Sequence, residues 1–168
     1  VGVVVVGFSI SALVLAVQFG AHLGLVTSLL AVLFAAIPLG IVIPTFLWLD
    51  RFEAEPTRLL VFAFAWGALL AAALAALFNT SALAVFEAAT APPSALTATA
   101  VVVAPVVEEG LKGLLVLFVW WFMRREFDGL TDGLVYAGMV AAGFAFTENI
   151  SYLGQAFQEG GGRYLAAT

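Results

Sequence analysis

Five long apolar stretches run along the chain and are separated by short segments that are richer in polar residues. They cover roughly residues 1–19, 24–49, 58–78, 97–122 and 131–157. A helix needs about 20 consecutive apolar residues to cross the hydrocarbon core of a bilayer. Each stretch is therefore predicted to be a transmembrane helix. The chain is predicted to be all-α, a single polytopic transmembrane helical bundle with about five spans.

The composition agrees with a chain that is solvated mainly by lipid. Hydrophobic residues make up 64% of the chain and charged residues 10%, whereas soluble domains carry about 25% charged residues. The basic residues are few and scattered, which argues against a nucleic-acid partner. The absence of cysteine excludes disulfide bonds and Cys-ligated metals. Both ends are abrupt, so we expect further residues, and further spans, beyond them.

Basic residues predict the orientation of the bundle. The loops 50–58 and 123–130 each carry two arginines, whereas the connections 20–24 and 79–96 carry no Lys or Arg. Lys and Arg favour the cytoplasmic side of a membrane, and interfacial tryptophans also flank both arginine-bearing loops. The loops 50–58 and 123–130 are therefore predicted to be cytoplasmic.

Charged side chains lie well inside two of the predicted spans. Glu108, Glu109 and Lys112 lie in the fourth span, and Glu148 lies in the fifth. Each costs roughly 2.5–3.5 kcal/mol at the centre of a bilayer. On a helix, Lys112 can pair with Glu108 or with Glu109, but it cannot fully neutralise both. Crowded carboxylates in a low dielectric tend to share a proton, which is the chemistry of a general acid or base.

The depth of the acids suggests that they meet. Glu108 lies about 11 residues, or roughly 16 Å, from the outer end of its span, and Glu148 lies roughly 14 Å from the outer end of its own. Asn149 and Tyr152 can donate hydrogen bonds at this level. Pro105 is predicted to kink the fourth span and to admit water beside the carboxylates. The sequence therefore predicts a water-accessible, acid-rich pocket about halfway into the membrane.

Other interpretations of these charges stay open. They could form a structural ion-pair network that holds the helices together, or line a proton or ion pathway, as in a proton-coupled transporter. His22 is assigned to a turn, Asp132 to a helix cap, and the acids of loop 50–58 to a solvated surface. Two stripes of small residues are assigned to helix packing: Ala68, Ala72 and Ala76, and Ala137, Ala141 and Ala145.

Two motifs resemble those of a known family. Glu108-Glu109-Gly-Leu-Lys112 is similar to its Glu-Glu-x-x-Lys motif, and Phe144-Ala-Phe-Thr-Glu148-Asn149 is similar to its Phe-x-x-x-Glu-Asn motif. The flanks Asp132–Gly138 and Asp50–Pro56 also resemble it, so the likeness spans residues 42–157. The family is the PrsW-type intramembrane proteases, relatives of the Abi/CAAX-prenyl protease superfamily.

The resemblance implies a multi-pass enzyme of the bacterial plasma membrane that cuts membrane-tethered proteins near the outer face. Its known type of substrate is a single-pass anti-sigma factor. The resemblance implies that Glu108, Glu109, Lys112, Glu148 and Asn149 are the catalytic set. The cofactor stays open: the mechanism is either glutamic or dependent on a divalent metal such as zinc, with Glu108 and Glu148 as candidate ligands.

The chain departs from the family pattern at one point. A third family motif places a histidine on a later span, and the chain stops before such a span. His22 lies on the wrong helix to replace that histidine. The alternative function is therefore a non-catalytic, PrsW-like accessory subunit of a larger membrane complex.

Overall fold

The computed structural model describes residues 2–52, 54–89, 91–124, 127 and 129–165. Within these ranges the chain is helical and has no strand. The elements in chain order are α1 (Gly2–Leu23), α2 (Leu25–Leu49), the 3₁₀ turn η1 (Asp50–Phe52), α3 (Thr57–Ala65), the π-helical η2 (Trp66–Ala71), α4 (Ala72–Ala89), α5 (Pro92–Ala98), the π-helical η3 (Thr99–Val103), α6 (Ala104–Phe122) and α7 (Leu130–Leu165).

Four helical stretches of the described chain are long and apolar enough to cross a membrane: Gly2–Leu23, Leu25–Leu49, Thr57–Ala89 and Leu130–Gly160. The predicted span at 97–122 is also helical, because α5, η3 and α6 follow one another directly. It is not among the four, and α6 carries the charged Glu108, Glu109 and Lys112. The chain is an all-helical membrane bundle.

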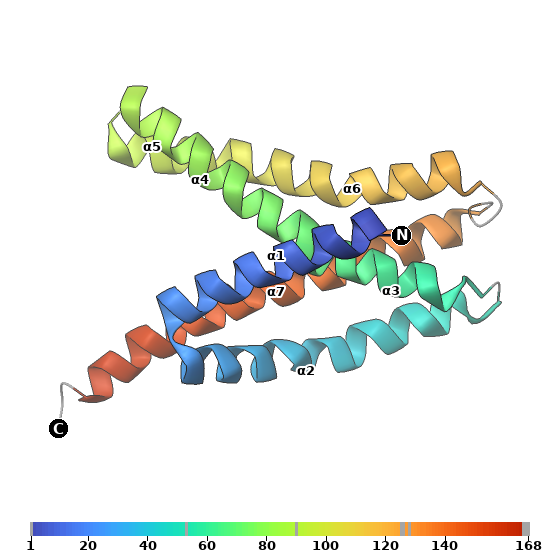
Figure 1. Ribbon diagram of the computed structural model, residues 1–168, viewed down its shortest axis with the longest axis horizontal. Helices are drawn as coiled ribbons and strands as arrows, with labels where there is room; N and C mark the ends of the chain where they lie inside the picture. Colours follow the sequence, from blue (N-terminus) through green and yellow to red (C-terminus); the bar gives the residue numbers. More distant parts are fainter. Residues whose placement is uncertain (1, 53, 90, 125–126, 128, 166–168) are drawn as a thin grey trace.

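Helix α7 lies at the centre of the bundle. It contacts α1, α2, α3, η2, α4 and α6, and Figure 1 shows it running across the molecule between α2 on one side and α6 on the other. The largest core cluster joins α3, α6 and α7 through Leu60, Leu115, Val119, Tyr136 and Val140. The surroundings of each α7 side chain are therefore determined by the helix that packs against that side of α7.

The backbone of the third span, at the junction of α3 and η2, comes very close to that of α7. A Cβ added to Gly67 would lie 2.0 Å from the carbonyl oxygen of Val140, and one added to Gly143 would lie 2.1 Å from that of Phe64. Only glycine allows two backbones to come this near, as small residues do in membrane helices generally. The two positions therefore form the contact that fixes α7 against the third span.

The predicted small-residue stripes are correct on only one helix. Ala68 and Ala72 are buried as predicted, but Ala137, Ala141 and Ala145 are exposed. The packing face of α7 is instead the one that carries Val140, Gly143 and Phe144. Spacing alone did not distinguish the face of α7 that meets protein from the face that does not.

The chain between the third and fourth spans is more helical than predicted. The sequence assigns residues from Asn79 onward to a connection, but α4 continues to Ala89 and α5 begins at Pro92. Alanine-rich sequence of this kind has a high helix propensity. Asn79 therefore lies on a helix inside the bundle, which matters for the site described below.

Three acids in or beside the charged loops accept hydrogen bonds from other residues. Asp50 is buried and accepts a 3.1 Å bond from the backbone N–H of Glu55, while Glu55 accepts the hydroxyl of Tyr136. The solvated-surface prediction for loop 50–58 is therefore wrong at these two acids, and Glu53 lies outside the described residues. Asp132 accepts the N–H of Gly129 at 2.8 Å, which confirms the predicted cap at the start of α7.

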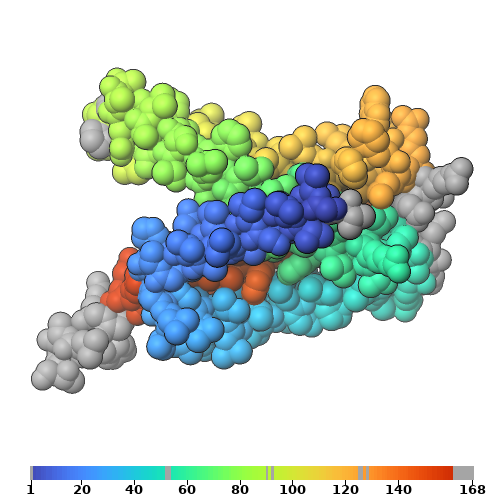
Figure 2. All heavy atoms as spheres, viewed as in Figure 1, coloured from blue at the N-terminus to red at the C-terminus, as the bar shows by residue number. Residues whose placement is uncertain are grey.

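Apolar side chains cover the outer faces of α1 and α2. Leu13, Val17, Leu29, Leu33 and Ile37 are all exposed, on helices that form much of the face seen in Figure 2. A patch of this extent is unfavourable in water and suits the hydrocarbon of a bilayer. The polar residues inside the bundle are therefore surrounded by an apolar outer surface.

Candidate active site

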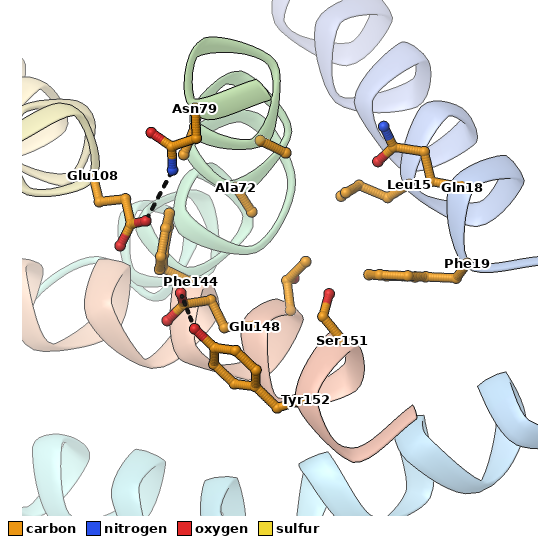
Figure 3. A pocket seen from close by; sticks show the side chains of 13 residues that line it. Leu15, Gln18, Phe19, Ala72, Asn79, Glu108, Phe144, Glu148, Ser151 and Tyr152 are labelled. Atoms are coloured by element: carbon orange, nitrogen blue, oxygen red, sulfur yellow. Dashed lines mark hydrogen bonds between the residues drawn. The ribbon is translucent and has the colours of Figure 1, made fainter. Parts of the chain in front are cut away.

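A pocket of about 240 Å³ lies between α1, α4, α6 and α7. One part of its wall is apolar, including Leu15, Phe19, Ala72 and Phe144. Seven polar side chains form the rest: Gln18, Asn79, Glu108, Thr147, Glu148, Ser151 and Tyr152. The pocket therefore contains both carboxylates that the depth estimate expects to meet, one from α6 and one from α7 (Figure 3).

Glu108 projects into the pocket from the second turn of α6. The helix begins at Ala104 directly after η3, whose wider π-helical turns precede Pro105, the predicted site of a kink. The Glu108 Oε1 accepts a 3.2 Å hydrogen bond from Nδ2 of Asn79 on α4. Figure 3 shows this bond bridging the two helices at the edge of the pocket. Glu108 is therefore oriented by an amide.

Glu148 projects from α7 into the same space. It is half-buried, and its Oε1 lies 3.5 Å from the hydroxyl of Tyr152 one turn further on. Glu108 and Glu148 line the same pocket from two helices. Two carboxyl groups that face one space can act on the same water molecule, one as proton acceptor and the other as hydrogen-bond partner. The pair is therefore suited to acid and base roles.

Glu109, the second acid of the Glu-Glu-x-x-Lys motif, has different surroundings from Glu108. Lys112 Nζ donates to Glu109 Oε1 at 2.8 Å, and the Glu109 side chain is 75% exposed whereas that of Lys112 is 18% exposed. The ammonium also lies 4.0 Å from the ring centroid of Phe144, a cation–π contact. Lys112 therefore pairs with Glu109, and Glu108 is the acid of this motif that lines the pocket.

Two other residues from the sequence analysis lie away from the pocket. Asn149 is half-buried on α7 but is not part of the pocket wall. His22 is exposed in the last turn of α1, where its carbonyl accepts Nε2 of Gln158 at 2.7 Å. The structure thus brings Glu108 and Glu148 together and leaves Asn149 and His22 outside.

Two bonds hold the helices that carry the acids. The Thr147 hydroxyl, directly before Glu148, donates to the carbonyl of Ala68 at 2.6 Å. The Trp66 indole donates to the carbonyl of Leu111 on α6 at 2.9 Å. Both partners in the third span belong to η2. The π-helical segment therefore fixes α6 and α7 relative to each other beside the pocket.

Asn79 was not among the residues predicted for the site. Its polar side chain follows a long apolar run, and it lies 10 residues before the end of α4 at Ala89, or about 15 Å. This depth is similar to the depths estimated for the two acids, so the same estimate would have found it. It was missed because the segment was assigned to a connection.

The described residues do not form a complete metal site. Catalytic zinc generally has three protein ligands, and no three His, Cys, Asp or Glu side chains in the described ranges come together closely enough to hold a metal. Glu108 and Glu148 contribute two acidic groups to one pocket. Their assignment as metal ligands therefore stays a prediction.

Comparison with known proteins agrees with this picture. The family described as PrsW family intramembrane metalloprotease matches residues 55–168, which include both acidic motifs. The chain belongs to the PrsW family. It is also 35% identical over 120 residues to Protease PrsW of Geobacillus kaustophilus (strain HTA426), an alignment that covers 71% of this chain and 50% of that protein. This PrsW-family chain thus spans about half the length of the curated relative it matches, and no solved structure matches it significantly.

Proposed function

We propose that this chain forms the catalytic centre of an intramembrane endopeptidase. The observation that carries the proposal is the meeting of Glu108 and Glu148, from successive helices, in one polar pocket inside an apolar bundle. Intramembrane acids mark functional sites because they are costly to keep in lipid. Membership of the PrsW family supports peptide hydrolysis as that function.

Glu108 acts as the general base. Its carboxylate takes a proton from a water molecule in the pocket, and the resulting hydroxide attacks the carbonyl carbon of the scissile peptide bond. When the C–N bond breaks, the same proton passes to the leaving nitrogen. Asn79 holds the carboxylate at 3.2 Å while this occurs. The atoms and the proton of this step balance with one water molecule and one peptide bond.

Glu148 acts on the other side of the reacting water. With Tyr152 beside it at 3.5 Å, it orients the water as a carboxylate or, as the neutral acid, donates a hydrogen bond to the oxyanion that forms at the substrate carbonyl. The Lys112 ammonium, paired with Glu109, lies over the ring of Phe144, one turn of α7 before Glu148. Lys112 thus tunes the site, and Glu109 is not the base.

The proposed substrate is a single-pass membrane protein of the anti-sigma-factor type. A helix satisfies its backbone groups internally, so its peptide bonds become open to attack only after local unwinding. The proposed setting is a bacterial plasma membrane, with loops 50–58 and 123–130 in the cytoplasm and with room for a larger membrane complex. Cleavage would occur at the depth of the two acids.

A reconstituted cleavage assay tests this function. The protein is placed in liposomes with a reporter that has one apolar span and a tagged juxtamembrane segment, and products are identified by mass spectrometry. We expect Glu108→Gln and Glu148→Gln each to lower cleavage at least about 100-fold, because each removes a proton acceptor or charge stabiliser.

Glu109→Gln is the matched control, because it makes the same change at the adjacent and exposed acid. It should keep activity within about tenfold of the parent, as expected for an indirect electrostatic effect. Full activity in both Glu108→Gln and Glu148→Gln would reject the proposed function.

A further inference from the structure

Asn79 is the polar side chain that joins the third span to the acid of α6. It lies on α4, half-buried, and its Nδ2 donates to Glu108 Oε1 at 3.2 Å. The neighbouring Thr80 and Ser81 are exposed, and the Ser81 hydroxyl bonds to the carbonyl of Leu77 on its own helix. Asn79 therefore differs from the polar residues beside it, because its bond reaches another helix.

The other polar atom of Asn79 is left unsatisfied. Within the described part of the chain, Asn79 Oδ1 is buried and has no hydrogen-bond partner. Asn79 also lines a second cavity, of about 400 Å³, between α4, η3, α6 and α7. The Thr99 hydroxyl lines this cavity too, and among the described residues it is likewise buried without a hydrogen-bond partner. A buried acceptor without a partner destabilises a fold. Asn79 is thus a poor choice for stability alone.

Glu108 has a specific need for such a donor. The cation of its own motif, Lys112, is engaged with Glu109, so the Glu108 carboxylate is not fixed by an ion pair within α6. A free glutamate side chain samples several rotamers. A donor from a facing helix restricts these rotamers and sets which carboxylate oxygen faces the reacting water. Figure 3 shows the amide of Asn79 in this place.

We propose that Asn79 is a positioning residue, which holds the Glu108 carboxylate in the orientation needed to accept a proton from water. The inference rests on the proposed function, because positioning has a purpose only if Glu108 acts as a base. It adds a third helix, α4, to a site otherwise carried by α6 and α7. It also explains why a side chain with one unpaired buried oxygen is kept inside an apolar helix.

Two nearly isosteric substitutions test the role. Asn79→Leu removes both the donor and the unsatisfied acceptor, so we expect kcat to fall roughly 10–100-fold, with KM within about threefold and the unfolding midpoint unchanged or raised. Asn79→Asp replaces the donor by an acceptor beside Glu108 and should be at least as inactive as Asn79→Leu. Ser81→Ala, two residues away and exposed, is the control and should match the parent in both measurements.

A role in packing makes the opposite prediction, because Asp preserves the shape of Asn. Asn79→Asp would then be milder than Asn79→Leu, and activity would fall together with the unfolding midpoint. That pattern, or a kcat for Asn79→Leu within threefold of the parent, would overturn the inference while leaving the proposed function intact. If the parent protein cleaves no reporter at all, the proposed function and this inference fail together.

Discussion

Hydroxyl groups from α7 hold carboxylates at two depths of the bundle, and the two bonds differ in burial. Tyr136 is fully buried and its hydroxyl donates to Glu55, which ties the start of α7 to the loop before α3. Tyr152 is 62% exposed and its hydroxyl lies 3.5 Å from Glu148. A hydrogen bond to a charged group contributes more when it is shielded from solvent. The two tyrosines should therefore differ in their effect on stability.

Tyr136→Phe should lower the free energy of unfolding by about 1–3 kcal/mol, because it removes a buried partner of a carboxylate. The measurement is reversible unfolding in mixed detergent micelles. Tyr152→Phe makes the same change at an exposed hydroxyl and should shift this free energy by less than about 0.5 kcal/mol. Equal effects of the two substitutions would contradict the assigned role of Tyr136.

Individual site residues were predictable where the energetic cost of a charge in lipid and its depth in the membrane identify them. Glu108 and Glu148 were identified because a charged side chain inside a membrane is costly and marks a functional site. The rise per residue of an α-helix then gave their depth in the membrane. The choice of Lys112 between its two acids was not predictable, because i,i+3 and i,i+4 partners are nearly equivalent on a helix. Tertiary contacts made that choice, since Lys112 lies over Phe144 and Asn79 binds Glu108.

At the level of elements, two π-helical segments lie beside the site. One, η2, provides Trp66 and the Ala68 carbonyl that hold α6 and α7, and the other, η3, precedes Pro105. π-helical turns occur frequently at functional sites. The sequence suggested an interruption near Pro105 but gave no sign of η2, because no proline or polar residue marks it.

The crossing of η2 and α7 depends on two glycines. Gly67→Ala and Gly143→Ala should each lower the free energy of unfolding by about 1–3 kcal/mol, since each new methyl would meet backbone atoms that cannot move aside cheaply. Gly113→Ala on α6 meets no atom within 4 Å and should be neutral or slightly stabilising. Thermal unfolding in detergent would measure all three. A neutral Gly67→Ala would show that the helices are farther apart than described.

Helical spans were largely predictable, whereas their packing faces were not. Apolar length located the helices, but the face of α7 that meets η2 follows from Gly143 rather than from the stripe of exposed alanines. The helical continuation to Ala89 was missed because Asn79, Thr80 and Ser81 look like a break in an apolar run. In a membrane helix the polar residues can point inward instead of ending the span.

At the scale of the whole molecule, aromatic and basic groups gather at one end. Arg51 lies 4.7 Å from the Trp48 ring centroid, and Arg124 lies 5.7 Å from those of Trp120 and Trp121. Such groups are typical of a membrane–water interface on the cytoplasmic side. The acids lie well inside this boundary, and the predicted orientation places them nearer the outer face.

Glu108 and Glu148 converge inside the bundle, and cysteine cross-linking measures this proximity. The chain has no cysteine, so Glu108→Cys with Glu148→Cys creates a single pair that a short bis-thiosulfonate reagent can bridge in membranes. Glu109→Cys with Glu148→Cys is the matched control, because Glu109 is exposed and paired with Lys112. Digestion and mass spectrometry should find the bridge in the first pair and far less in the second. Equal bridging of both pairs, or none between positions 108 and 148, would show that the two acids do not converge.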